Sequence, residues 1–270
     1  MPLCPETGIA YDRSGPRGGT PVLLLHAGVA DRRMWDPQWN TLTADRDVVR
    51  LDLRGFGEST ECPVSTWRHD QDVANTLQAL GIEQAHLIGC SFGAGVATEV
   101  ALEHPEHVAS LLLVTPGGAL LTEMSLELRG FFDAEAAALD GNDLDAAVQA
   151  NLDWWVDGPR RGADPERQGL REQVEIMQRR AFELTAGWDR DADELDPPAP
   201  DRLAELTVPT LVLSGALDIP SVTLAADMVA THVRDARHTS WPDVAHLPSL
   251  ERPADFESLV RDWLNRVETA

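Results

Sequence analysis

The turn Gly89-Cys90-Ser91-Phe92-Gly93 constrains the fold of this chain more than any other feature of its sequence. It follows the apolar pair Leu87-Ile88 and precedes a segment rich in Ala and Val with helical spacing. A strand therefore runs into a helix through only a few residues, and Ser91 lies at the apex of the turn. Such a turn holds the serine in a sparsely populated backbone conformation, which the flanking glycines permit because they bring no colliding side chains. We expect the hydroxyl of Ser91 to be exposed at the carboxyl end of a strand.

This position is the one that a nucleophile of acyl transfer requires. The N–H groups at the start of a helix lack partners within the helix, and the helix dipole favours negative charge there. The N–H of Phe92 is expected at this point, so the turn offers an attacking oxygen and a donor for the oxyanion that the attack creates. The pattern G-x-S-x-G also arises by chance, and its place between strand and helix favours the functional interpretation. Cys90 lies beside the apex, and we predict that it is a buried neighbour without a chemical role.

Continuous apolar runs indicate a mostly parallel sheet buried on both faces. They occupy residues 22–25, 48–53, 109–114 and 209–215, a further strand is expected near 236–241, and segments with helical spacing lie between several of these strands. This alternation predicts a doubly wound α/β fold, in which functional sites gather at the carboxyl ends of the strands. His26, Arg54 and Ser91 each follow a strand, so we expect them on one edge of the sheet.

The character of the chain changes over residues 120–200. Strand-like runs disappear, acidic and Ala-rich helical segments take their place, and a proline cluster follows at residues 197–200. We predict an inserted helical cap at 120–200 between two parts of an α/β core, 1–119 and 201–270. Trp154, Trp155 and Trp188 either roof a substrate pocket or pack the small core of the cap, and both interpretations stay open. Five arginines in this segment could bind a substrate carboxylate, but charged residues on solvent-exposed helix surfaces are the simpler interpretation. They are Arg129, Arg160, Arg161, Arg179 and Arg180.

The charge balance narrows the expected partners. The chain has 45 acidic residues, 22 basic residues and a formal net charge of −23, and every basic residue is Arg. A negative field disfavours nucleic acid and anionic membranes, and the lack of Lys excludes a lysine Schiff base. We expect a small-molecule substrate and a monomer or homodimer. No apolar run approaches the roughly 20 residues of a membrane span, and the first residues lack signal-peptide features, so a cytoplasmic location is expected.

Two further side chains complete a constellation around Ser91. A serine nucleophile needs a base, and the base needs an acid that orients it. Asp218 follows a late strand and His246 follows the next one, whereas the loop 115–118 after an earlier strand holds no acid. Cys4, Cys62 and Cys90 show no metal or disulfide spacing. The expected chemistry therefore uses no metal and no cofactor.

Five stretches of the chain together resemble the α/β-hydrolase fold family; they are LLLHAG at 23–28, DLRGFGES at 52–59, GCSFG at 89–93, VPTLVLSGALD at 208–218 and AHLPSLERP at 245–253. Within the family the chain is most similar to the small capped esterases and lactonases that include 3-oxoadipate enol-lactonases. The resemblance implies an α/β-hydrolase fold and the triad order Ser91, Asp218, His246.

The same resemblance implies a role for each site residue. Ser91 would be the nucleophile, His246 the general base and then acid, and Asp218 the group that holds the imidazole. Gly28 would supply the second oxyanion donor beside Phe92. Ala27 and Ala245 stand where the family usually has Gly, and a Cβ at position 27 restricts positive φ, which could reshape the oxyanion loop.

The leading hypothesis is a cofactor-independent serine hydrolase that cleaves a small carboxylic ester or lactone through an acyl-enzyme. The same residues could serve carbon–carbon bond hydrolysis, perhydrolysis, a cofactor-free lyase or oxygenase reaction, or a non-catalytic ligand receptor. Dehalogenase and epoxide hydrolase relatives use an Asp nucleophile, so Ser91 disfavours both.

The remaining polar candidates receive simpler interpretations. His69 and His86 fit surface positions, and Arg54 fits a bracing role in its loop. A metal pair at His104 and His107 is disfavoured because no third ligand is evident.

Overall fold

The computed structural model describes residues 2–162 and 164–269 of the chain. Within these residues, seven strands form one sheet in the order β1-β3-β2-β4-β5-β6-β7. The strands are β1 (Tyr11–Ser14), β2 (Val22–Leu25), β3 (Val48–Leu51), β4 (Ala85–Cys90), β5 (Val108–Val114), β6 (Thr210–Gly215) and β7 (Ala236–Trp241). Only β1 pairs antiparallel in this sheet of described residues, with β3 as its neighbour; the other pairs are parallel. The mostly parallel doubly wound sheet predicted from the sequence is thereby confirmed.

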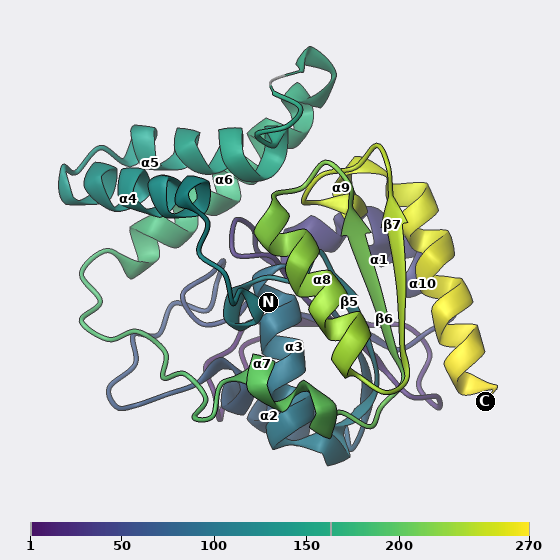
Figure 1. Cartoon of the computed structure of the whole chain (residues 1–270). Coiled ribbons are helices and arrows are strands. Elements are labelled where there is room, and N and C mark those ends of the chain that lie inside the picture. Colours follow the sequence, from purple (N-terminus) through teal and green to yellow (C-terminus); the bar gives the residue numbers. More distant parts are fainter. Residues whose placement is uncertain (1, 163, 270) are drawn as a thin grey trace.

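Helices connect the strands (Figure 1). The α-helices are α1 (Asp36–Leu42), α2 (His69–Ala79), α3 (Phe92–Glu103), α4 (Leu126–Asp140), α5 (Leu144–Asn151), α6 (Gln168–Thr185), α7 (Ala199–Arg202), α8 (Pro220–His232), α9 (Pro248–Glu251) and α10 (Pro253–Glu268). Short helical segments are η1 (Arg32–Trp35), η2 (Pro105–His107), η3 (Gly118–Leu120), η4 (Leu152–Asp157), η5 (Pro165–Arg167) and η6 (Leu203–Glu205). None of the helices in the described part of the chain combines the length and the apolar character needed to cross a membrane.

The central strands are mostly apolar because both faces of the sheet are covered. On β2, Leu23 and Leu25 belong to one buried cluster, which includes side chains of α2, α3 and α8. Val22 and Leu24 point to the other face and join a second cluster with Trp35 of η1 and residues of α10. In Figure 1, β6 and β7 run between α8 and α10. A strand buried on both sides gains nothing from polar alternation, which explains its continuous apolar run.

The turn between β4 and α3 depends on two very close backbone approaches. Ser91 has φ 52° and ψ −113°, outside the regions that L-residues favour. A Cβ added at Gly89 would lie 2.2 Å from the carbonyl oxygen of Gly93. A Cβ added at Gly93 would lie 2.5 Å from the carbonyl oxygens of Leu25 and His26 on the neighbouring chain segment. The two glycines therefore let α3 begin directly against the sheet, with Ser91 at the point of entry.

Helices α4, α5 and α6 pack together with η4 and lie above the rest of the chain in Figure 1. Within the described residues of 120–200 there is no strand, as the sequence predicts. After α6 the chain returns to the core, where α7 contacts α3. The division into core 1–119, cap 120–200 and core 201–270 stays a prediction, and "cap helices" below means α4, α5, η4 and α6.

Replacing Gly93 by Ala should destabilise the protein strongly. The new methyl group would meet the backbone of Leu25 and His26, which cannot move aside as a flexible side chain could. We expect a loss of more than about 3 kcal/mol in the free energy of unfolding, measured by urea denaturation. Gly19→Ala is the matched control, because no heavy atom lies within 4 Å of a Cβ at that position. Equal stability of the two variants would contradict the packing argument.

Candidate active site

Three predicted site residues form one hydrogen-bonded chain. Nε2 of His246 lies 2.7 Å from Oγ of Ser91, and Nδ1 of His246 lies 2.7 Å from Oδ2 of Asp218. A carboxylate can only accept, so Nδ1 carries a proton and Nε2 is left to accept the hydrogen of the Ser91 hydroxyl. Asp218 is 2% exposed, and its Oδ1 accepts a further hydrogen bond of 2.7 Å from the N–H of Ile219. The geometry fixes both the tautomer and the direction of the imidazole.

The backbone and ring of His246 are held by segments that are distant in sequence. The hydroxyl of Thr115, which follows β5, donates to the carbonyl oxygen of His246 over 2.8 Å. Trp155 of η4 lies against the imidazole with ring centroids 4.4 Å apart. Contacts from a residue that follows a strand of the sheet and from a cap helix therefore hold His246 in place.

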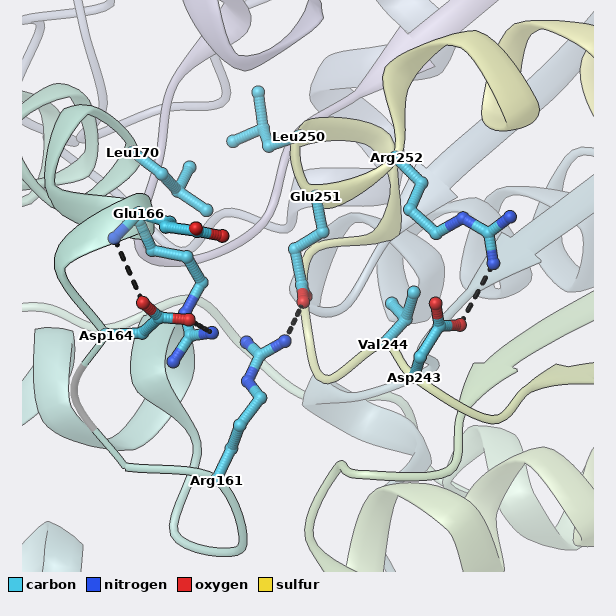
Figure 2. Close-up of a pocket in the computed structure, with 10 residues that line it drawn as sticks. Arg161, Asp164, Glu166, Leu170, Asp243, Val244, Leu250, Glu251 and Arg252 are labelled. Carbon is cyan, nitrogen blue, oxygen red and sulfur yellow. Dashed lines mark hydrogen bonds and ion pairs between the residues drawn. The ribbon is translucent and has the colours of Figure 1, made fainter.

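Glu251 of α9 stabilises the loop 242–247, which contains His246 and is called the histidine loop below. Its Oε1 accepts from the N–H of Leu247 at 3.0 Å and from the N–H of Ala245 at 3.2 Å. Arg161, which follows η4, donates to the same carboxylate and also to the carbonyl oxygens of Asp157 and Val156. Figure 2 shows this Arg161–Glu251 pair in a cavity of about 330 Å³ beside the loop. The residues on both sides of His246 are thus anchored to one buried carboxylate, which is itself paired with a residue from beyond η4.

The loop after β2 is fixed by a buried neutral histidine. The N–H of Leu53 donates to Nε2 of His26 over 2.9 Å, so the proton lies on Nδ1, which donates to the carbonyl oxygen of Ala27 over 2.8 Å. Complete burial lowers the pKa of His26 and keeps the ring neutral. Ala27 is not among the residues with positive φ in the described chain, so its Cβ causes no strain there. Whether the loop differs in shape from that of relatives with Gly at this position stays a prediction.

The two predicted oxyanion donors lie at the same cavity as Ser91. Gly28 and Phe92 line it together with Ser91 and His246. A Cβ added at Gly28 would be 3.4 Å from Cβ of Phe92, so the two segments lie close together. Phe92 is the first residue of α3, where N–H groups have no partner within the helix. The arrangement can place two backbone donors near one oxygen atom.

This cavity has a volume of about 890 Å³ and lies between the strand ends and the cap helices. The core contributes residues such as Phe56 and Gly118, and the cap helices contribute Phe131, Trp155 and Phe182. Trp155 thus belongs to the pocket, whereas Trp154 stacks on Phe131 at 5.3 Å within the cap helices. Trp155 therefore fits the interpretation as part of the pocket, and Trp154 fits the interpretation as packing within the cap.

Several single-residue expectations can now be compared with the structure. Arg54 forms a two-bond ion pair with Asp72 and donates to the carbonyl of Thr7, which fits its bracing role. The surface positions expected for His69 and His86 are wrong, because the two are only 9% and 4% exposed. His69 lines the cavity, and burial lowers its pKa to about 3. The apolar surroundings come from Trp67 and Phe92, and no sequence pattern links these residues to His69.

The family model described as alpha/beta hydrolase fold matches residues 20–253. The chain belongs to this alpha/beta hydrolase fold family. It is 23% identical to 3-oxoadipate enol-lactonase 1 of Acinetobacter baylyi, over 94% of this chain and 92% of that protein. It is 30% identical to 2-hydroxymuconate semialdehyde hydrolase of Pseudomonas sp. strain CF600, over 97% of this chain and 93% of that protein.

Among solved structures, the enol-lactonase from Burkholderia xenovorans LB400 superposes on this alpha/beta hydrolase with a TM-score of 0.78. The two chains are 22% identical, with 97% of this chain and 98% of the other covered. At this identity the likeness shows the fold. The curated enol-lactonase relative bears out the resemblance to the lactonase and esterase branch of the alpha/beta hydrolases, and the superposed structure bears out the fold.

Cys90 of this alpha/beta hydrolase should resist alkylation in the native protein. It is fully buried, and burial raises the pKa of its thiol to about 12, so the reactive thiolate is about one part in ten thousand at pH 8. Cys62 is exposed. After iodoacetamide treatment at pH 8, mass spectrometry should find the label on Cys62 and none on Cys90, with both labelled in urea. A native Cys90 adduct would contradict the predicted inert role.

Replacing Glu251 by Ala should destabilise the histidine loop. The change removes the acceptor of two backbone N–H groups and leaves the guanidinium of Arg161 without its carboxylate. We expect a loss of about 3–5 kcal/mol in the free energy of unfolding, since one partner of a buried pair is lost. Glu257→Ala, which breaks a more exposed helical pair with Arg261, should cost less than about 1 kcal/mol. Similar losses in both variants would refute a special role for Glu251.

Proposed function

We propose that this alpha/beta hydrolase is a serine hydrolase that cleaves a small carboxylic ester or lactone through an acyl-enzyme. The observation that carries the proposal is the buried hydrogen-bonded chain from Asp218 through His246 to Ser91, which ends at the floor of a cavity large enough for a small molecule. Gly28 and Phe92 line the same cavity beside the hydroxyl. Nucleophile, base, orienting acid and oxyanion donors are the parts that acyl transfer needs.

In the first half-reaction Oγ of Ser91 attacks the carbonyl carbon of the substrate. Nε2 of His246 takes the hydroxyl proton as the new C–O bond forms, and the N–H groups of Gly28 and Phe92 hold the oxyanion. The imidazolium is stabilised by Asp218 at Nδ1. When the tetrahedral intermediate collapses, the bond to the leaving oxygen breaks and that oxygen receives the proton from Nε2. The products are an alcohol, or the freed hydroxyl end of a lactone, and an ester on Ser91.

In the second half-reaction water replaces the leaving group. Nε2 of His246 takes a proton from the water as its oxygen attacks the acyl carbon, and the same two N–H groups hold the second oxyanion. Collapse breaks the bond to Oγ of Ser91, which recovers its proton from the imidazolium. The acid is released, and the enzyme returns to its starting state with no external oxidant, reductant or metal required.

The names of relatives support ester or lactone hydrolysis, and one name supports a different reaction. The Acinetobacter baylyi relative is named as an enol-lactonase, and a lactonase hydrolyses the ester bond of a ring. The 30% identical relative is named for 2-hydroxymuconate semialdehyde, so carbon–carbon bond hydrolysis by the same residues is the second candidate. In that reaction a proton must first be transferred within the substrate before a ketone carbon is attacked.

A panel of three substrate types separates the two candidates. Simple 4-nitrophenyl esters and aliphatic lactones should be turned over if ester cleavage is the activity. A vinylogous diketone should be cleaved only if carbon–carbon hydrolysis is the activity, and ester turnover should then be weak.

Alanine at position 91 should abolish turnover and labelling by a fluorophosphonate probe, while circular dichroism stays unchanged. Asp218→Asn should lower kcat by about a thousandfold or more, because the imidazole loses the acceptor that fixes its tautomer. Both effects are measured on the best 4-nitrophenyl ester of the panel. Ser258→Ala is a control, since that exposed hydroxyl bonds only to the Ala254 carbonyl of its own helix. Labelling that persists without the Ser91 hydroxyl would refute the proposal.

A further inference from the structure

No guanidinium or ammonium side chain of the described residues lines the cavity above Ser91. None of the described residues that line it is Arg, and the sequence contains no Lys. Four arginines near the cap helices bond elsewhere: Arg160 donates to the Ala216 carbonyl, Arg161 to Glu251, Arg179 to Asp145 and Arg180 to the Gly57 carbonyl. Arg129 of α4 does not line the cavity. A substrate carboxylate would therefore find no arginine or lysine side chain here.

Negative charge gathers in the cavity instead. Glu99 of α3 and Glu194, which follows α6, both line it. Burial, together with the negative charges of Asp70 and Glu194, raises the pKa of Glu99 to about 7. The nearby cation, Arg68, is already bonded to Asp70 and Glu103. Among the described residues, no cation forms an ion pair with the carboxyl of Glu99, and Arg68 acts on it only from a distance.

The cap side of the cavity offers acceptors that need donors. Glu135 of α4 accepts from Nδ2 of Asn151, and the other hydrogen of that amide goes to the carbonyl of Ala147 over 3.0 Å. Gln178 of α6 lines the cavity and is 4% exposed, and its buried Oε1 has no hydrogen-bond partner among the described residues. A buried acceptor without a partner is costly, so this oxygen is poised for a donor supplied by a ligand.

Aromatic rings complete the lining. Five of the six Phe residues of the chain line this cavity, namely Phe56, Phe92, Phe131, Phe132 and Phe182, and Trp155 adds a sixth ring. The faces of such rings attract cations, and the attraction grows where water is excluded. The lining thus combines aromatic rings, carboxylates and an amide oxygen without a partner, and it includes no guanidinium group among the described residues. Such a lining favours an organic cation.

We propose that the substrate cleaved at Ser91 carries a positively charged nitrogen, as an ammonium or quaternary ammonium group, seated between the aromatic rings and the carboxylates of Glu99 and Glu135. The inference rests on the proposed ester or lactone hydrolysis and adds the substrate class. Glu99 is seven residues after Phe92 on α3, which places it about 10 Å along the helix from the turn. The nitrogen therefore lies several bonds from the carbonyl that is attacked.

Matched substrates test the charge preference in both halves of the ester. In the acyl arm, 4-nitrophenyl 6-aminohexanoate is compared with the uncharged heptanoate and with the anionic hydrogen adipate. In the alcohol arm, butyrylcholine is compared with its uncharged isostere 3,3-dimethylbutyl butyrate. In at least one arm kcat/KM for the cation should exceed that for the uncharged ester about tenfold or more, and the adipate should be the poorest. Equal or better turnover of the uncharged ester in both arms overturns the proposal.

Two charge-removing variants locate the preference. Glu99→Gln and Glu135→Gln should each lower the cation-to-neutral ratio of kcat/KM by about threefold or more. Glu103→Gln removes the same charge from the same helix, but its carboxylate is bonded to Arg202 and Arg68 and does not line the cavity. It should leave the ratio unchanged. If it lowers the ratio as much as Glu99→Gln does, the preference comes from the net charge of −23 and the proposal fails.

Binding to the Ser91→Ala variant decides the question even without turnover. If no ester of any charge is cleaved, the proposed hydrolysis is refuted by that result alone. Calorimetry then compares choline with 3,3-dimethylbutan-1-ol, and hexylammonium with hexan-1-ol. Tighter binding of at least one cation than of its partner, weakened by Glu99→Gln or Glu135→Gln, supports the cation site. No difference within either pair overturns it.

Discussion

The contact on which the rest of the structure depends is the backbone approach of α3 to β4 and to the end of β2. It is possible only because positions 89 and 93 carry no Cβ, which would sit within 2.5 Å of carbonyl oxygens. This approach forces Ser91 to φ 52° and starts α3 at the carboxyl edge of the sheet. The hydroxyl is thereby presented on a rigid element, and its position does not depend on a mobile loop.

The second requirement is that His246 reach this hydroxyl in a single orientation. Asp218 sets the tautomer, Thr115 holds the carbonyl oxygen, Trp155 covers the ring and Glu251 holds the neighbouring N–H groups. These contacts come from β5, from both sides of β7 and from the cap helices. Because the ring is oriented before any ligand arrives, little reorganisation is left for the reaction itself. The pairing of Glu251 with Arg161 also makes the loop depend on the segment beyond η4.

The polarity of the cavity follows from how the chain uses its arginines. Most of them are engaged in ion pairs and in hydrogen bonds to carbonyl groups at other sites, as with Arg54 and Asp72 or Arg171 and Asp157. The cavity is left with aromatic rings and carboxylates. Net charge by itself predicts a negative field everywhere, whereas the local absence of guanidinium groups is a property of the folded arrangement.

The sequence by itself determined the sheet and the place of the nucleophile turn. The apolar run at 22–25 coincides with β2, because a strand buried on both faces is apolar along its whole length. The strand expected near 236–241 coincides with β7, whose polar and half-exposed residues lie at the edge of the sheet. The Gly-x-Ser-x-Gly pattern is equally local, since the turn needs small residues at fixed offsets. The order Ser91, Asp218, His246 could be read from strand ends, and the family resemblance adds Gly28.

Tertiary structure alone decided which side chains surround those residues. His69 is buried, the ring of Trp155 lies against that of His246, and Glu251 accepts hydrogen bonds from the N–H groups beside His246. These contacts join segments whose spacing in sequence carries no periodic signal. The helices η1 and α1 also had no predicted counterpart, because Trp35 and Leu42 pack against α10 rather than forming an extended amphipathic pattern of their own. Local preferences act over a few residues, whereas burial and pairing at this site depend on contacts between residues more than a hundred positions apart, such as Thr115 and His246.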